Sequence, residues 1–201
     1  MAAKTQLIDG ESVITAPEGV EAFIKASGLL SSPEAYGTVA VMGPQSSGKS
    51  TLMNKLFGTP FAVMDSSAGR SQTTLGIWVS KADSNPLLVL DLQGTDSIEG
   101  GEASKKFERQ SSLFALALSD VLLVNVWFQD LGRHDASNMS LLRTVFEVHL
   151  QLFARSEAPA ASSKTTLLFV IRDHIEQQTP FARLEEMVRR DIATIWGSIE
   201  K

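Results

Sequence analysis

Short hydrophobic runs alternate with stretches of helical spacing along most of the 201-residue chain. Five runs of apolar, often β-branched residues predict strands, at residues 38–42, 77–82, 87–92, 121–127 and 167–171. Four stretches with apolar residues three and four positions apart predict helices, at residues 49–57, 107–117, 141–153 and 184–195. Because strands and helices alternate, the pattern predicts an α/β fold with a mostly parallel sheet flanked by helices. Turn-forming residues at 83–86 predict a hairpin between the second and third strands.

The same pattern divides the chain into two parts. Residues 1–36 carry no chemical motif and are interpreted as an N-terminal lead-in, with a short helix around residues 20–24. Residues 37–201 are interpreted as one domain, since a domain averages about 150 residues. The chain stops just after a predicted helix, where an alternating fold would supply another strand. The domain is therefore expected to be incomplete at its C-terminal end.

Composition excludes several classes of site and partner. Eighteen Lys and Arg against 23 Asp and Glu give a net charge of −5, so no nucleic-acid partner is expected. Cysteine is absent and the three histidines do not cluster, so neither a thiolate site nor a zinc site is expected. Residues 113–128 fall short of the ~20 apolar residues that span a bilayer, and the N-terminus lacks the layout of a secretory signal. The chain is expected to be soluble and cytoplasmic.

One motif has a spacing that ordinary Gly/Ser turns do not require. Residues 43–50 match Gly-x-x-x-x-Gly-Lys-Ser/Thr between a predicted strand and a predicted helix, which is the context of a P-loop. In such a loop backbone N–H groups can cradle phosphates, so Lys49 is expected to reach the β and γ phosphates and the Ser50 hydroxyl to ligate Mg²⁺. The predicted phosphate-binding residues are Gly43, Pro44, Gln45, Ser46, Ser47, Gly48, Lys49, Ser50 and Thr51.

A second motif follows at the end of another predicted strand. Asp91 lies 41 positions beyond Ser50, where P-loop enzymes keep an Asp associated with Mg²⁺, and Gly94 could offer its N–H to a γ-phosphate. Thr73 and Thr74 close the long connection between the two motifs. Either threonine could give a hydroxyl to Mg²⁺ when the γ-phosphate is present, and spacing alone does not choose between them.

A charged pair follows the last predicted strand. Arg172 and Asp173 are expected to emerge at the carboxyl edge of the sheet, where ligands bind in open α/β folds. A helix cap or a surface ion pair is the alternative, because charged residues after a strand are common. The residues alone leave both interpretations open.

Together these segments resemble the Root Hair Defective three and Sey-type dynamin-like GTPases, relatives of the atlastins that fuse endoplasmic reticulum membranes. The likeness runs from about residue 6 to residue 196. Its motifs are GPQSSGKSTLMNKLFGTPF, MDSSAGRSQTTLGIW, LDLQGTD, RQSSLFALALSDVLLVNVWFQDLGR and LLFVIRD. The resemblance implies a dynamin-like G domain that binds GTP with Mg²⁺.

The resemblance also implies roles for single residues. Thr74 falls where related guanylate-binding and atlastin proteins place their Mg²⁺-binding switch threonine, so it is preferred over Thr73. Asp91 and Gly94 match the second switch, which makes Ser50, Thr74 and Asp91 the implied metal ligands. Arg172 and Asp173 match the Arg-Asp pair whose carboxylate accepts hydrogen bonds from guanine N1 and N2. These implied roles favour a guanine nucleotide over ATP.

The chain departs from this family in its P-loop and its second switch. Atlastins carry a catalytic arginine inside the P-loop, whereas this chain has Gln45, Ser46 and Ser47 there. The loop is similar to that of dynamins, in which the Gln and Ser help to hold the attacking water and a charge-compensating cation. The implied catalytic set is therefore Lys49, Gln45, Ser46 and Thr74, with Arg70 as the candidate arginine finger and Arg133 as its rival. Gln93 stands where plant members carry Glu.

The function expected from these features is Mg²⁺-dependent GTP hydrolysis. The alternatives are a truncated interaction module that binds GTP with little turnover and a P-loop ATPase or kinase, which Asp173 disfavours. The resemblance implies a nucleotide-dependent homodimer at the cytosolic face of the endoplasmic reticulum. Family members continue through a last strand, a helical bundle and two membrane segments, so the chain is expected to be truncated and to reach the membrane only through segments absent from it.

Overall fold

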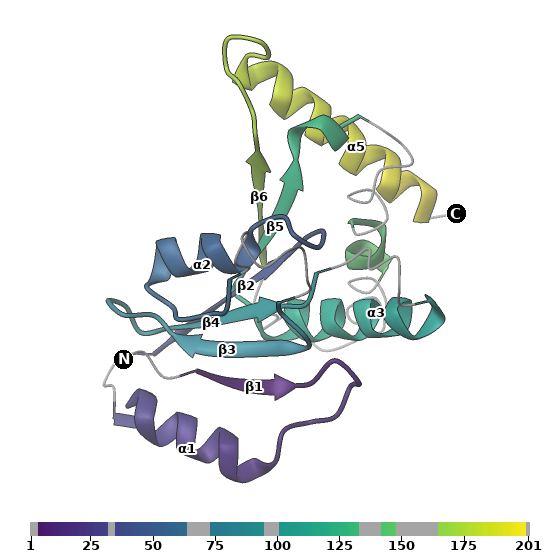
Figure 1. Ribbon diagram of the computed structural model, residues 1–201. Coiled ribbons are helices and arrows are strands. Elements are labelled where there is room, and N and C mark those ends of the chain that lie inside the picture. Colours follow the sequence, from purple (N-terminus) through teal and green to yellow (C-terminus); the bar gives the residue numbers. More distant parts are fainter. Residues whose placement is uncertain are drawn as a thin grey trace, which may run out of the picture.

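A six-stranded sheet forms the centre of the protein. The computed structural model describes residues 4–31, 35–63, 73–94, 101–132, 142–147 and 165–199. Its strands are β1 (Lys4–Ile8), β2 (Gly37–Met42), β3 (Ile77–Lys81), β4 (Leu87–Leu92), β5 (Val121–Trp127) and β6 (Thr166–Arg172). They lie in the order β1-β3-β4-β2-β5-β6 (Figure 1). Since β2 pairs in parallel with β4 and β5, and β5 with β6, the predicted α/β class with a mostly parallel sheet is confirmed.

The second and third predicted strands do form a hairpin. Strands β3 and β4 pair antiparallel, with Trp78 opposite Asp91 and Lys81 opposite Leu88. The connection is tight, because the Ala82 N–H donates to the Leu87 carbonyl at 3.0 Å. The turn residues of this segment therefore predicted both the break and the reversal of direction.

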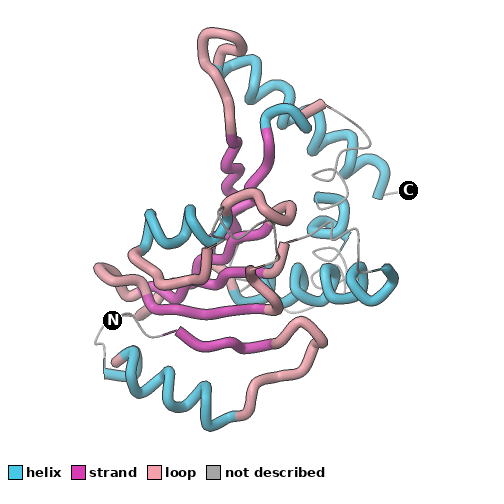
Figure 2. Tube along the Cα trace, viewed as in Figure 1, coloured by secondary structure: helices cyan, strands magenta, loops and turns pink. Residues whose placement is uncertain are grey.

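Helices lie on both sides of the strands (Figure 2). They are α1 (Pro17–Ser27), α2 (Lys49–Phe57), α3 (Gly101–Leu118) and α5 (Phe181–Ile199), and residues 142–147 are also helical. The predicted helices at 49–57, 107–117 and 184–195 are confirmed, and the last two extend beyond the predicted bounds. Of the predicted helix at 141–153, only residues 142–147 belong to the described part of the chain. Within that part, no helix combines the length and apolar character that crossing a membrane needs.

The core occupies both faces of the sheet, because successive side chains of a strand point to opposite sides. In β2, Val39 and Val41 pack with Met53 of α2 on one face. Ala40 and Met42 belong to the larger cluster on the other face. That cluster also contains Phe107, Ala115 and Leu116 of α3, and Ile195 of α5. A strand buried on both sides has to be apolar throughout, which is why its sequence predicted it clearly.

Part of the lead-in belongs to the sheet. Strand β1 pairs antiparallel with β3 and forms one edge, with a register shift between Gln6 and Ile8. Helix α1 packs beside it (Figure 1). This helix covers the predicted segment at residues 20–24 and ends at Gly28, which takes the left-handed conformation of a helix C-cap. The domain boundary between residues 36 and 37 stays a prediction. The sequence did not predict that residues 4–8 contribute a strand to the sheet.

The register brings the motif-bearing strand ends to one edge. Val41 lies opposite Asp91 across the β2–β4 pair, and Met42 lies opposite Val124 across the β2–β5 pair. Arg172 lies opposite Trp127 at the end of β6. The loop after β2, the carboxylate at the end of β4 and the charged pair after β6 therefore meet at the carboxyl ends of parallel strands.

Candidate functional site

The loop between β2 and α2 follows a path that glycine makes possible. Gly43 has φ 152°, and a Cβ there would collide with the carbonyl oxygen of Asn125. Gly48 has φ 78°, in the left-handed region, and directly precedes the first residue of α2. A Cβ on Gly48 would come within 2.9 Å of Arg172 Nη1. The positive φ at both positions favours glycine, and at Gly43 a backbone oxygen also leaves no room for a Cβ.

Lys49 is held over this loop. Its ammonium donates to the carbonyl oxygen of Pro44 at 2.9 Å, and only 6% of the residue is exposed. Burial lowers the pKa of Lys49 to about 8, although the nearby Asp91 carboxylate acts in the opposite direction. The lysine also lines a cleft whose walls are Gln45, Ser46, Gly48, Lys49, Ser50, Thr51, Val63, Thr73, Thr74 and Gly94. A cation at the floor of a cleft beside a helix N-terminus is an arrangement that suits an anion.

Two hydroxyls converge on one carboxylate beside the loop. Ser50 Oγ donates to Asp91 Oδ2 at 2.7 Å, and Thr74 Oγ1 donates to the same oxygen at 3.3 Å. The two hydroxyl oxygens are 3.1 Å apart. The structure thus brings Ser50, Thr74 and Asp91 together from three separate segments. It is Thr74, rather than its neighbour Thr73, that makes these contacts.

These groups fit a magnesium ion. Asp91 Oδ1 is buried and has no hydrogen-bond partner among the described residues. Burial raises the pKa of Asp91, against the effects of the Ser50 and Thr74 hydroxyls and of the Lys49 charge. An unpartnered buried carboxylate oxygen is costly, and a cation would supply its missing partner. Mg²⁺ prefers oxygen ligands of this kind, so Ser50, Thr74 and Asp91 could hold it. Their role as ligands stays a prediction.

Gly94 brings the second motif against the loop. A Cβ on Gly94 would lie 2.5 Å from the Cα of Gln45 and 3.0 Å from Lys49 Nζ. Only a glycine allows the chain to pass so close to the P-loop at this point. The approach puts the backbone of Gly94 at the cleft, and its bond to a γ-phosphate stays a prediction.

Gln93 ties the second motif to the segment that follows Thr74. Its side-chain Oε1 accepts a hydrogen bond from the Gly76 N–H at 2.7 Å, and its own N–H donates to the Gly76 carbonyl at 2.8 Å. Gly76 has φ 77°, and a Cβ there would collide with the Ile8 carbonyl oxygen. The amide of Gln93 thus fixes the backbone two residues after Thr74. A glutamate at position 93 could accept the same bond, since this contact uses only a side-chain oxygen.

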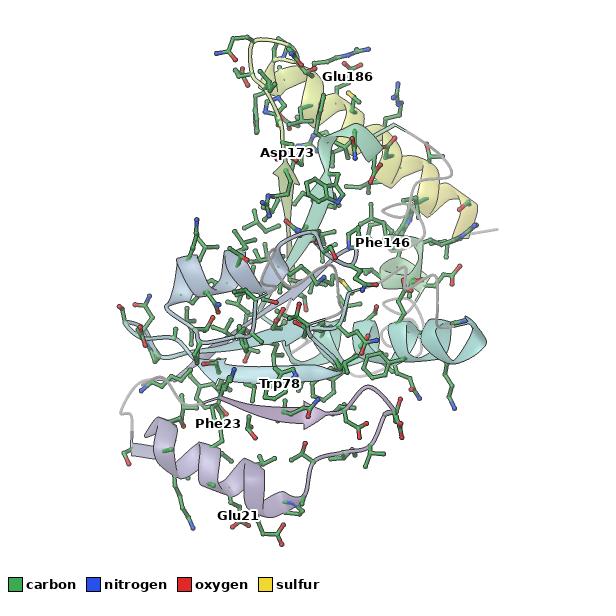
Figure 3. The ribbon with its side chains drawn as sticks, in the orientation of Figure 1. Glu21, Phe23, Trp78, Phe146, Asp173 and Glu186 are labelled. Carbon is green, nitrogen blue, oxygen red and sulfur yellow. The ribbon has the colours of Figure 1, made fainter. Side chains whose placement is uncertain are left out.

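The two residues of the charged pair at the end of β6, Arg172 and Asp173, lie in different environments. Arg172 Nη1 donates to the carbonyl oxygen of Ser47 at 2.9 Å, and its guanidinium lies 5.9 Å from the ring centroid of Trp127. Arg172 therefore contacts the P-loop from the end of β6. Asp173 is exposed just beyond the end of β6 and has φ 57° (Figure 3). Guanine recognition by this pair stays a prediction.

The structure describes two of the remaining predicted catalytic residues, Gln45 and Ser46. Gln45 is half-buried and Ser46 exposed, and both line the cleft. Ser46 has φ 58°, which is uncommon for a residue other than glycine. Their assignment to the attacking water and a cation stays a prediction. Arg70 and Arg133, the two candidates for the arginine finger, lie outside the described residues.

One residue at the site was not singled out by its sequence. Asn125 lies in β5 and is fully buried. Its amide Nδ2 donates to the Ser47 carbonyl oxygen at 2.9 Å and to Ser47 Oγ at 2.8 Å. The available signal was a lone amide inside the apolar run at residues 121–127. A buried polar side chain needs partners, so such a residue predicts a nearby polar structure.

Comparison with known proteins identifies the family of the chain. The family model of the root hair defective 3 GTP-binding protein (RHD3) GTPase domain matches residues 42–201. Protein ROOT HAIR DEFECTIVE 3 homolog 1 of Oryza sativa subsp. japonica is 50% identical, over 100% of this chain and 22% of that protein. A SEY1 homolog of Dictyostelium discoideum is 48% identical, over 83% of this chain and 19% of that protein. The chain thus spans about a fifth of the length of these relatives.

Solved structures with a similar arrangement are more distant in sequence. An Era variant of Aquifex aeolicus bound to GDP and aluminium fluoride is 18% identical, with a TM-score of 0.47, over 78% of this chain and 46% of that one. NFeoB of S. thermophilus is 17% identical, with a TM-score of 0.42, over 79% of this chain and 61% of that one. The family assignment rests on the sequence relatives and on the model that covers residues 42–201, and the chain belongs to the RHD3 GTPase domain family.

Proposed function

We propose that this domain binds GTP together with Mg²⁺ and hydrolyses its γ-phosphate. The observation that carries the proposal is the convergence of Ser50, Thr74 and Asp91 beside a P-loop whose lysine is buried in the same cleft. An ordinary turn before a helix needs neither the buried cation nor the buried carboxylate. Membership of the RHD3 GTPase domain family supports the same proposal.

The reaction is in-line displacement at the γ-phosphorus. Water attacks that atom, the bond to the oxygen bridging the β and γ phosphates breaks, and GDP and inorganic phosphate leave. Mg²⁺, when bound, neutralises charge on the β and γ oxygens. Lys49 and the loop N–H groups hold the phosphates and stabilise the charge that develops on them. Gln45 and Ser46 take the dynamin-like role of positioning the water and a further cation, and the finger is assigned to Arg70 with Arg133 as its rival.

A single-turnover assay with the protein in excess over radiolabelled GTP tests this function. Phosphate release that depends on Mg²⁺ and is absent with ATP supports a GTPase. Binding of GTP without phosphate release would favour the alternative, a nucleotide-dependent interaction module. Hydrolysis of ATP at an equal rate would contradict the assignment of guanine recognition to Asp173.

The depressed pKa of Lys49 predicts a pH dependence of nucleotide binding. Because the pKa of the free protein's Lys49 is about 8, the side chain is mostly charged at pH 7 and mostly neutral at pH 9. If only the charged form binds phosphate well, the affinity for GDP falls about tenfold between these pH values. Equilibrium titration with a fluorescent GDP analogue measures it. Lys49→Arg stays charged over this range and is the matched control. If the GDP affinity of that variant falls equally between pH 7 and pH 9, the pH dependence comes from the nucleotide and not from Lys49.

We also propose how the domain is used in a longer protein. The resemblance to endoplasmic reticulum fusion GTPases supports a nucleotide-dependent homodimer on the cytosolic face of that membrane, reached through segments outside residues 1–201. The Oryza and Dictyostelium relatives are four to five times as long as this chain, which leaves room for such segments. Co-sedimentation of a full-length protein with vesicles and its mass with and without a GTP analogue test the two parts separately.

A further inference from the structure

Asn125 is a buried amide near the C-terminal end of the otherwise apolar strand β5. Its neighbours in β5, Val124 and Val126, are buried hydrophobic residues, and Asn125 itself is fully buried. An amide in such a place costs free energy unless hydrogen bonds compensate it. Its Oδ1 has no partner among the described residues. An aliphatic side chain would avoid that cost, so stability of the sheet alone does not account for an asparagine here.

The contacts of the Nδ2 atom explain why an asparagine occupies position 125. This atom donates to both the carbonyl oxygen and the Oγ of Ser47, which is 78 positions away in the sequence. Arg172 Nη1 donates to the same carbonyl at 2.9 Å. A carbonyl oxygen has two lone pairs, so these two donors occupy it fully. Both donors come from the sheet side of the loop, from β5 and β6.

This contact bears on the direction of the Gly48 N–H, one of the groups predicted to bind phosphate. The peptide bond between Ser47 and Gly48 is planar and trans, so its C=O and N–H point in opposite directions. Because the Ser47 carbonyl is held toward Asn125 and Arg172, the Gly48 N–H is directed away from the sheet. Gly48 lines the cleft, and its φ of 78° permits this peptide orientation. Rotation of the peptide would replace a donor in the cleft with an acceptor that repels phosphate.

The same amide also reaches the start of the loop. Ser47 Oγ accepts from Asn125 and donates to the Pro44 carbonyl oxygen at 2.8 Å. Lys49 Nζ donates to that carbonyl as well, at 2.9 Å. The chain of hydrogen bonds therefore joins Asn125 to both ends of the loop and to its lysine. The Asn125 carbonyl oxygen, which faces Gly43, adds a backbone contact at the first glycine.

We propose that Asn125 is a positioning residue, which fixes the Ser47–Gly48 peptide so that the P-loop is organised for phosphate before the nucleotide arrives. The inference rests on the proposed function, because it needs a nucleoside di- or triphosphate as the ligand. Asn125 is fully buried and is not among the residues that line the cleft. Its effect therefore falls on affinity for the phosphates, through the loop.

The test is titration of GDP and GTP into Asn125→Val, with thermal unfolding measured in parallel. Valine suits a strand, has no polar atoms and removes the unpartnered Oδ1. We expect affinity for both nucleotides to fall about tenfold, with an unfolding midpoint close to that of the parent. Ser119→Ala is the matched control, since Ser119 Oγ is another buried oxygen without a partner among the described residues, and it lies outside the P-loop. Asn125→Thr, which has no amide donor, replaces the valine variant if that one does not fold.

A double-mutant cycle separates positioning from general stability. Asn125 and Arg172 hold one carbonyl, so their effects on GDP affinity should be non-additive in Asn125→Val, Arg172→Met and the double variant. Additive effects, or parent-like affinity in Asn125→Val, would overturn the inference while leaving the proposed function intact. A parent protein that binds neither GDP nor GTP would overturn both.

Discussion

Replacing Lys49 with alanine should lower the affinity for GTP about a hundredfold or more, as expected for loss of a buried charge-assisted contact. The ammonium is the positive charge at the floor of the cleft, 6% exposed and held by the Pro44 carbonyl. No other side chain of the loop between Gly43 and Ser50 carries a charge. Titration with a fluorescent GTP analogue, at pH 7 where Lys49 is charged, measures the loss.

Lys55→Ala is the matched control for this prediction. Lys55 belongs to the same helix, α2, but is exposed. Its removal changes the net charge by the same amount without touching the cleft, so its affinity should stay close to that of the parent. Circular dichroism shows whether each variant is folded. A folded Lys49→Ala protein that binds GTP as the parent does would show that the phosphates lie elsewhere.

The elements that sequence predicted best are those buried on both faces. Strands β2, β4 and β5 consist mostly of apolar residues, because each lies between two other strands and beneath helices. Strand β1 was missed for the opposite reason. It is a five-residue edge strand with the sequence Lys-Thr-Gln-Leu-Ile, and its pairing with β3 joins residues 69 to 76 positions apart, from Ile8 with Ile77 to Lys4 with Ser80. Such pairing is non-local, so local pattern does not reveal it.

Some residues of the site were likewise predictable from the sequence, whereas others were not. The P-loop and Asp91 were predicted because their chemistry imposes fixed residue types at fixed places, and the structure brings Ser50 and Asp91 to 2.7 Å. Spacing did not choose between Thr73 and Thr74, whereas the structure directs Thr74 onto Asp91. The contact of Arg172 with the Ser47 carbonyl spans 125 positions, and only the assembled sheet creates it. Supporting residues of this kind have no motif of their own.

The change of Asp173 to asparagine should transfer preference from guanine to xanthine nucleotides. A carboxylate accepts from the N1 and N2 groups of guanine, whereas an asparagine amide accepts from N1 and donates to the oxygen that xanthine carries at C2. Aspartate is thus complementary to guanine and asparagine to xanthine, whereas the opposite combinations leave hydrogen-bonding groups mismatched. Sites that hydrogen-bond a polar ligand group discriminate by up to ~10⁴ to 10⁵. Because Asp173 is exposed, we expect the ratio of XTP to GTP affinity to rise by about 10² to 10³.

Asparagine is also the substitution that the backbone at this position tolerates. Asp173 has φ 57°, in the left-handed region, which asparagine adopts more readily than most residues other than glycine. The variant therefore changes the base-reading group without adding backbone strain. Competition of XTP, GTP and ATP against a fluorescent nucleotide measures the preference. Glu186→Gln makes the same acid-to-amide change at an exposed position of α5 and should leave the order unchanged. If Asp173→Asn keeps the parent's selectivity, the carboxylate does not read the base, and its place after β6 is only that of an exposed loop residue.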